Sequence, residues 1–173
     1  KLMVSTIANG KATFGPYIGT RDIAIMHSVA DIQGLNFITK EVFSNAAAAI
    51  CGMVHSRLRG ETSGEKEKRT RSVALSMLGT TTPGAMRVKE LLEDKGYEIV
   101  AFHQNGVGGI AMEDMIAEGA FTGVLDLNLH EVGDGVVGGL HGASREYRLE
   151  TAGRMGIPQV IAPGSINYTL QGP

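Results

Sequence analysis

The chain has 173 residues, with 16 lysines and arginines against 18 aspartates and glutamates and a formal net charge of −2. This length suits one domain with a substantial core, and the balanced charge gives no long-range attraction for a polyanion such as nucleic acid. Aromatic residues make up 5% of the chain and tryptophan is absent, so no platform for stacking exposed bases is expected.

The single cysteine, Cys51, rules out an internal disulfide framework and fits a reducing compartment. It follows the apolar run 46–50, where a buried, unreactive thiol is expected. No apolar stretch approaches the roughly 20 residues that span a bilayer, and no charged-then-apolar leader precedes the first predicted strand. These features predict a soluble, cytoplasmic protein that contacts neither membrane nor nucleic acid. Because the chain starts at Lys1 and stops at Pro173 just after a strand and turn, we expect a fragment of a longer protein.

The first seventy residues predict one strand, two helices and a loop. The strand covers residues 2–8, and the helices cover residues 20–30 and 39–58. Residues 56–71 mix glycine, serine and charges of both signs, and their glutamates offset their cations. This segment is interpreted as a solvated loop or linker rather than a basic binding patch.

From Ser72 onward, strands alternate with helices. Continuous apolar runs predict strands at residues 72–78, 97–102, 123–127 and 158–162, and such runs are typical of parallel strands covered on both faces. Helices are predicted at residues 83–95 and 110–118, and from Ser144 to Gly156 with Met155 facing inward. For the first helix, Thr82 is the expected N-cap. The predicted fold class is Rossmann-like doubly wound α/β, a mostly parallel sheet with helices on both faces, in one domain over residues 1–173.

The turn after the second predicted strand has features of a phosphate site. Its glycine leaves the backbone amides open, and its hydroxyls can donate to oxygen, at the positive end of a helix dipole. Its members are Gly79, Thr80, Thr81 and Thr82. Ala85 and Met86 stand where a P-loop carries lysine and a hydroxyl residue, so a Walker mechanism is not supported. A threonine-capped helix start without a ligand fits the turn equally well.

A second glycine-rich turn follows the next strand. Residues 106–111 fit the loose dinucleotide pattern Gly-x-Gly-x-x-Ala through Gly106, Val107, Gly108 and Gly109. Asp126, twenty positions after Gly106, stands where a ribose-binding acid would be. NAD or NADP is therefore one candidate ligand, and a tight strand-to-helix turn without a ligand is the alternative.

A polar cluster follows the strand at residues 123–127. It contains Asp126, His130 and Glu131, with Asp134 and His141 in the glycine-rich stretch beyond. Such side chains can hold Mg²⁺ beside a nucleotide or serve as acid and base. The His-Glu-x-x-His zinc pattern is absent from this cluster, so no structural metal is predicted, and each histidine alone is interpreted as a satisfied polar group.

The last turn adds Gly164 and Ser165 to the predicted site. Ligands of open parallel sheets bind outside the carboxyl ends of the strands. We therefore predict that Thr80, Gly106 and Ser165 converge on one rim.

Four segments together resemble a known family. They are Gly-Thr-Thr-Thr-Pro-Gly (79–84), Phe-His-Gln-Asn-Gly-Val-Gly-Gly (102–109), Gly-Val-Leu-Asp-Leu (123–127) and Ala-Gly-Arg-Met-Gly-Ile-Pro-Gln-Val-Ile-Ala-Pro-Gly (152–164). Asn45-Ala46-Ala47 and Gly52-Met53 extend the likeness over nearly the whole chain. The chain thus resembles an uncharacterised family named for the ATP-binding N-terminal domain of the tomato mosaic virus resistance protein. The resemblance implies a longer, two-lobed α/β domain that binds ATP, forms dimers, has no established reaction and, in plants, contacts a protein partner.

The function predicted from residues and resemblance together is ATP binding, with or without Mg²⁺. Amides of residues 79–82 and 106–109 would hold phosphates, and Asp126 or Glu131 would face ribose or metal. No residue is assigned a catalytic role, because no arginine or lysine is placed by motif to stabilise a transferring phosphoryl group. Two alternatives stay open: an NAD(P)-dependent oxidoreductase, and a nucleotide-regulated interaction module that exposes the apolar helix around residues 46–53.

Overall fold

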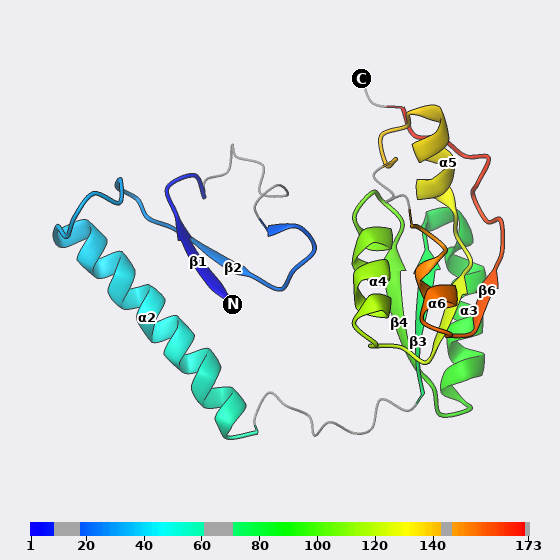
Figure 1. The fold of residues 1–173 in the computed structure, drawn as a ribbon, viewed down its shortest axis with the longest axis horizontal. Helices are drawn as coiled ribbons and strands as arrows, with labels where there is room; N and C mark the ends of the chain where they lie inside the picture. The colour runs from blue at the N-terminus through cyan, green and yellow to red at the C-terminus, as the bar shows by residue number, and fades with distance from the viewer. Residues whose placement is uncertain (9–17, 61–70, 143–146, 172–173) are drawn as a thin grey trace. The chain divides into compact units, whose positions relative to one another are not determined.

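The computed structural model describes residues 1–8, 18–60, 71–142 and 147–171 (Figure 1). The contacts between residues divide the chain into two compact units, Lys1–Glu67 and Lys68–Pro173. The boundary falls inside residues 56–71, the segment interpreted as a loop or linker. The sequence predicted one domain over residues 1–173, whereas the described residues form two compact units.

The first unit pairs two short strands. β1 (Leu2–Ser5) and β2 (Ala24–His27) run parallel, with Leu2 opposite Ala24 and Ser5 opposite His27. The prediction of a strand near residues 2–8 is confirmed, and the prediction of a helix at residues 20–30 is wrong. The backbone of β2 finds its hydrogen-bond partners on β1, a contact distant in sequence that the local pattern does not encode.

One long helix, α2 (Phe37–Leu58), follows β2 and confirms the predicted helix at residues 39–58. Asn36 caps its start, because its Oδ1 accepts the amides of Ile38 and Thr39, each at 3.0 Å. The Thr39 hydroxyl accepts the Asn36 amide at 2.9 Å, which completes a capping box.

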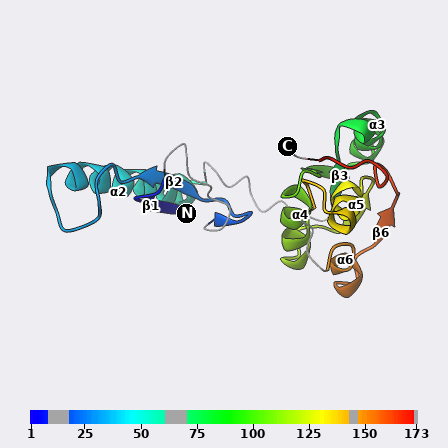
Figure 2. The same cartoon turned by 90° about the horizontal axis from the view of Figure 1, so that it is seen from above.

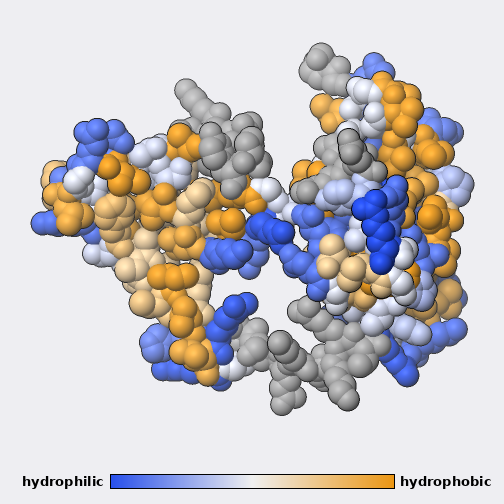
Figure 3. Space-filling view, in the orientation of Figure 1, coloured by the Kyte–Doolittle hydropathy of each residue, from blue (hydrophilic) through white to orange (hydrophobic). Residues whose placement is uncertain are grey.

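Most of α2 is exposed within the described chain. Its buried side chains are those of Thr39, Val42 and Ala46. Apolar side chains line the helix in Figure 3, and the large exposed ones are those of Phe37, Ile50, Met53, Val54 and Leu58. Cys51 is exposed as well, so the expectation of a buried thiol is wrong. By length and composition alone, α2 would be able to cross a membrane, whereas the sequence predicted no stretch of that kind.

The second unit is built on a parallel sheet of four strands in the order β4-β3-β5-β6. The strands confirm the four predicted from Ser72 onward: β3 (Ser72–Met77), β4 (Glu98–His103), β5 (Gly123–Asp126) and β6 (Gln159–Ile161). In the central register, Ser76 lies between Phe102 of β4 and Asp126 of β5.

Helices cover both faces of this sheet. A short 3₁₀ turn, η1 (Gly79–Thr81), leads into α3 (Thr82–Glu93). Three more helices follow along the chain. α4 (Gly108–Ala117) comes after β4, α5 (His130–Val137) comes after β5, and α6 (Thr151–Arg154) lies between α5 and β6. Figure 2 shows α3 on one side of the strands and α4 with α6 on the other. The predicted doubly wound α/β class is confirmed.

Two apolar cores result from the alternation of side chains along each strand. Val73, Leu75 and Ile99 point to the α3 side and pack against Ala85 and Leu92. The residues between them point to the other side, where Ala74, Phe102 and Val124 join the helix residues Met112, Ile116 and Ala152. Asp126 lies two residues after Val124, so its side chain emerges on the α4 face.

Several helix boundaries differ from the prediction. The N-cap of α3 is Thr81 rather than Thr82, because the 3₁₀ turn precedes the helix. Ser144 lies outside the described residues, and the described part of the last predicted helix is α6 alone, after which Met155 is 47% exposed rather than inward. α5 was not among the predicted helices, and it forms although it contains two glycines, at 133 and 135.

Candidate functional site

The strand order places one switch point at the carboxyl edge of the sheet. The chain runs from β3 to β4 on one side and then returns past β3 to β5 and β6 on the other. Crevices at such reversals, outside the carboxyl ends of the strands, are where open α/β sheets bind ligands. In this chain the switch point lies between β3 and β5.

Four polar side chains meet across this switch point, and we call them the hydroxyl rim: Thr80, Thr81, Asn128 and Ser165. The Asn128 amide nitrogen donates to Thr81 Oγ1 at 3.0 Å and to Ser165 Oγ at 2.9 Å. The hydroxyls of Thr80 and Ser165 form a short hydrogen bond with each other. The rim therefore joins the turns after β3, β5 and β6.

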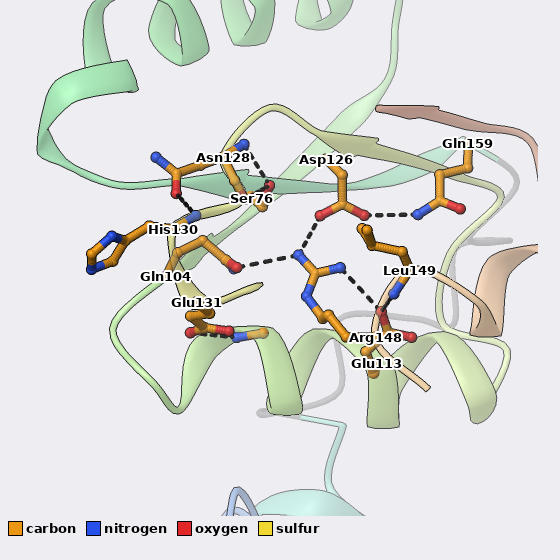
Figure 4. Close-up of polar contacts among 11 residues, drawn as sticks. Ser76, Gln104, Glu113, Asp126, Asn128, His130, Glu131, Arg148, Leu149 and Gln159 are labelled. Carbon is orange, nitrogen blue, oxygen red and sulfur yellow. Dashed lines mark hydrogen bonds and ion pairs between the residues drawn. The ribbon is translucent and has the colours of Figure 1, made fainter. Parts of the chain in front are cut away.

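Asn128 is held in place from the strand side. It is fully buried, its backbone amide donates to Ser76 Oγ at 3.1 Å, and Ser76 Oγ donates back to its carbonyl at 3.2 Å (Figure 4). The side-chain Oδ1 of Asn128 accepts the His130 amide at 3.0 Å. These bonds fix the carboxamide so that its NH₂ group points to the rim.

The turn after β6 comes unusually close to this centre. A Cβ on Gly164 would lie 2.1 Å from the Leu127 carbonyl oxygen and 2.8 Å from Thr81 Cγ2, so only glycine fits. The next residue, Ser165, has a φ of 59°, the left-handed region that residues other than glycine rarely adopt. Backbone strain of this kind clusters at functional sites and switch regions.

The amides of the first turn are only partly free. The Thr81 amide donates to the Leu78 carbonyl at 2.8 Å, and the Thr82 amide donates to the Gly79 carbonyl. The Thr82 hydroxyl also turns back to Leu78, at 3.3 Å. A ligand at this turn would therefore meet the exposed Gly79 and Thr80 and the positive end of α3.

The second turn holds a carboxylate of its own. Glu131 Oε1 accepts the amides of Gly106 at 2.8 Å and Gly109 at 3.2 Å, which are two of the amides predicted to hold phosphate. Burial raises the pKa of the Glu131 carboxyl above its ordinary value of 4.5, although both amides and the charge of Arg148 act in the opposite direction. Val107 stays exposed, whereas Gly108 packs against the His103 backbone. A phosphate at this turn would have to displace Glu131.

Asp126 lies in a buried network behind the turns rather than at the sheet edge. Arg148 Nη2 donates to its Oδ1 in a short ion pair, and Gln159 donates to its Oδ2 at 2.8 Å (Figure 4). Arg148 also reaches Glu113 at 3.1 Å and Gln104 at 3.2 Å. A contact between Asp126 and an exposed ribose would require this ion pair to open.

Arg148 carries the positive charge of this network. Burial alone would lower the pKa of its guanidinium, but the hydrogen bond and charge of Asp126, with the charges of Glu113 and Glu131, raise it. Within the part of the chain that the structure describes, four buried atoms of the network have no hydrogen-bond partner: Gln104 Nε2, Glu113 Oε2, Glu131 Oε2 and Arg148 Nε. Figure 4 shows this cluster between β5 and the α4 side of the sheet.

The predicted rim is therefore divided. The structure brings Thr80, Thr81 and Ser165 together, and Gly164 makes that approach sterically possible. Gly106 lies at the β4 turn, where its amide donates to Glu131 and a Cβ on it would meet the His141 backbone. Sequence reasoning assigned no role to Asn128 or Arg148, although Asn128 directly follows the strand predicted at residues 123–127, where polar residues were already of interest.

Two family domains match this chain in tandem. The N-terminal domain of the Uncharacterised protein family (UPF0261) matches residues 1–59, and the C-terminal domain of the same family matches residues 70–173. The chain belongs to family UPF0261. The gap between the two matches contains the boundary between the two compact units.

Relatives of this UPF0261 chain occur in bacteria and in a plant. It is 46% identical to a UPF0261 protein of Clostridium tetani over 173 residues, which are all of this chain and 41% of that protein. It is 41% identical, over its whole length, to the ToMV resistance protein Tm-1(GCR237) of Solanum lycopersicum, of which it covers 22%. A UPF0261 protein of Rhizobium meliloti is 37% identical over 167 residues, 39% of its length. The chain thus spans less than half the length of each of these relatives.

Proposed function

We propose that the second unit of this UPF0261 chain binds ATP at the hydroxyl rim, with the phosphates at the turn after β3. The observation that carries this proposal is the position of Asn128, which joins Thr81 and Ser165 across the switch point. Asn128 holds the Thr80 and Ser165 hydroxyls at the positive end of α3, and one of these two hydroxyls keeps a hydrogen for a phosphate oxygen, because only one of them donates in their mutual hydrogen bond. Mg²⁺ would accompany the ATP as its own counterion.

The chemistry of the rim supports binding without fast turnover. The side-chain partners described for the four rim residues are hydroxyls and one amide, and they include no arginine or lysine. Phosphoryl transfer needs such a cation, or a metal held in place, to neutralise the developing charge. Within this proposal, ATP is a bound ligand that the protein does not hydrolyse rapidly. The proposed location of the protein is the cytoplasm.

A nucleotide-regulated interaction module is a second candidate, favoured by the exposed apolar side chains of α2. Single exposed apolar residues are ordinary, but contiguous apolar surface marks a contact site. In this reading α2 contacts a second copy or a protein partner, and light scattering that finds only monomer contradicts the dimer. The NAD(P) oxidoreductase has no comparable support, because the acid assigned to ribose is paired with Arg148.

Isothermal titration of the purified protein with ATP, inorganic phosphate and NADH tests the main proposal. We expect ATP to bind and NADH to compete poorly with it. Thr80→Val and Ser165→Ala each remove one rim hydroxyl, and each should weaken ATP binding about tenfold, the effect of one lost hydrogen bond to a charged group. Mass spectrometry for a co-purified nucleotide gives an independent check.

Thr169→Val is the matched control for these variants. Thr169 is an exposed threonine of the same unit outside the hydroxyl rim, so its loss should leave ATP affinity unchanged. Equal ATP affinity in wild type, Thr80→Val and Ser165→Ala would remove the rim from the site. Absence of ATP binding to the folded protein would contradict the proposal as a whole.

A further inference from the structure

Three side chains outside the hydroxyl rim bring metal-ligating atoms together. His130 and Asp134 lie on α5, and His141 follows that helix. One ligand atom from each lies within 4.8 Å of the other two. His130 and Asp134 are fully buried, and His141 is half-buried. We propose that these three residues bind a divalent transition-metal ion, a role independent of ATP binding.

The separations suit a shared ion. His130 Nε2 lies 3.0 Å from His141 Nδ1 and 3.4 Å from Asp134 Oδ2. In a tetrahedral zinc site with bonds of about 2.0–2.1 Å, neighbouring ligand atoms lie about 3.3 Å apart. Two histidines and one carboxylate are the three-ligand set of catalytic zinc sites, which keep a fourth position for water.

Hydrogen bonds with the backbone hold two of these side chains in place and leave their ligand atoms close to that of His141. His130 Nδ1 donates to the Tyr168 carbonyl at 2.8 Å, so in the neutral ring Nε2 carries the lone pair. Asp134 is oriented by two amides, that of Leu170 at 3.2 Å on Oδ1 and that of His141 at 3.0 Å on Oδ2. Partners of this kind behind the ligands are typical of metal sites.

A metal ion would relieve the repulsion between the His130 ring and the Asp134 carboxylate. With the proton on Nδ1, the Nε2 lone pair of neutral His130 faces the negative Oδ2 of Asp134 at 3.4 Å inside the protein. Two acceptors this close repel each other unless a proton or a metal ion lies between them. Without a metal, a proton on His130 Nε2 would fill the same role, because it would pair with Asp134 Oδ2.

The glycines around α5 permit this assembly. A Cβ on Gly139 would lie 2.3 Å from the Asp134 carboxyl carbon, and one on Gly142 would lie 2.8 Å from the Asp134 carbonyl oxygen. A Cβ on Gly133 would lie 2.5 Å from the Ile166 carbonyl oxygen. The chain on both sides of the site therefore packs against bare backbone, which brings His141 and the Tyr168 carbonyl to α5. Glycine at these three positions allows a close approach that a side chain would block.

The ligand set favours one class of ion. Imidazole nitrogens suit Zn²⁺, Fe²⁺, Co²⁺ and Cu²⁺, whereas Mg²⁺ takes oxygen ligands and keeps its waters. This site therefore differs from the Mg²⁺ that would travel with ATP. The sequence placed these three residues in one polar cluster, but it did not indicate a shared site, because His130 and Asp134 face the same side only once residues 130–137 are helical.

The test is metal binding to the full chain, first stripped with a chelator and dialysed. We expect one equivalent of Zn²⁺ by elemental analysis, and an intense tetrahedral absorption spectrum with Co²⁺ that Zn²⁺ abolishes. His141→Ala and Asp134→Asn should each weaken Zn²⁺ binding more than about 100-fold, since loss even of an outer partner costs 10–100-fold. Mg²⁺ should not compete at equal concentration.

His55→Ala and His103→Ala are the matched controls, because both histidines are exposed and lie outside the cluster. Both variants should bind Zn²⁺ like the wild type. Circular dichroism and thermal unfolding establish that each variant is folded. If Asp134→Asn does not fold, the half-buried His141→Ala and the wild-type Co²⁺ spectrum decide the question. No bound Zn²⁺ or Co²⁺ in the wild type, or unchanged Zn²⁺ affinity in folded His141→Ala, would overturn the proposal.

Discussion

Glu131 accepts the backbone amide of Gly106 at 2.8 Å, inside the glycine-rich turn that follows β4. The same carboxylate oxygen accepts the Gly109 amide at 3.2 Å. The amides of the turn are thus available to an acceptor, as its glycines predict, and the acceptor they bind is a carboxyl group of the protein itself. A motif of this type establishes that amides are available and leaves open which acceptor occupies them.

The contact between Glu131 and the two amides leads to a first prediction. Glu131→Gln keeps the oxygen that accepts both amides, and burial already disfavours the charged carboxylate, as its raised pKa indicates. We expect a change of less than about 1 kcal/mol in the free energy of unfolding. Glu131→Ala leaves two buried amides without a partner and should cost about 2–4 kcal/mol. Urea unfolding at pH 7 measures both, and equal losses would contradict a hydrogen-bonding role for Oε1.

The buried Arg148 leads to a second prediction. Arg148→Met removes the cation and leaves the carboxylates of Asp126 and Glu113 buried without it. We expect a loss of about 3–5 kcal/mol in the free energy of unfolding. The added change Asp126→Asn should recover part of that loss, because it removes one of the unpaired charges.

Arg154→Met is the control for this experiment. Arg154 forms an ion pair with Glu150, but both side chains are largely exposed. Its removal should change the free energy of unfolding by less than about 1 kcal/mol. Similar losses for Arg148→Met and Arg154→Met would mean that burial does not govern the Arg148 ion pairs.

The strands of the second unit were predictable because their signals are local. Residues 72–78 and 123–127 are short apolar runs that end at glycine or polar residues, and they match β3 and β5 closely. α3 was predictable for the same reason, since Pro83 and Gly96 mark its ends. Parallel pairing then followed from the alternation of strands and helices.

The missed features depend on contacts distant in sequence. β2 exists because its backbone pairs with β1, and α5 forms although glycine weakens a helix by about 1 kcal/mol per residue. The partners of Asp126 illustrate the limit most clearly. Its spacing from Gly106 predicted a ribose contact, whereas the strand register turns its side chain toward Arg148. No local pattern indicates that Arg148, 22 positions later, is the partner.

Two glycines give a third prediction, because a methyl group meets different surroundings at each. A Cβ on Gly108 would lie 1.9 Å from the His103 carbonyl oxygen, whereas one on Gly84 meets nothing within 4 Å. Gly108→Ala should therefore lower the free energy of unfolding by at least about 1–3 kcal/mol. Gly84→Ala, in α3, should raise it by about 0.4–1 kcal/mol. Thermal and urea unfolding compare the two, and a stable Gly108→Ala protein would contradict the close packing of the β4 turn.

The exposure of Cys51 gives the last prediction. Because Cys51 lies on the open surface of α2, its thiol should react with a water-soluble disulfide reagent at the same rate in the folded and the urea-unfolded protein, within about tenfold. The chain has one cysteine, so the absorbance of the released thiol reports this position alone, and Cys51→Ser is the blank. If the folded protein reacts slower than the unfolded protein by orders of magnitude, and dilution restores the fast reaction, then a second copy covers α2. Protection that is independent of protein concentration would contradict the exposure of α2 within the single chain.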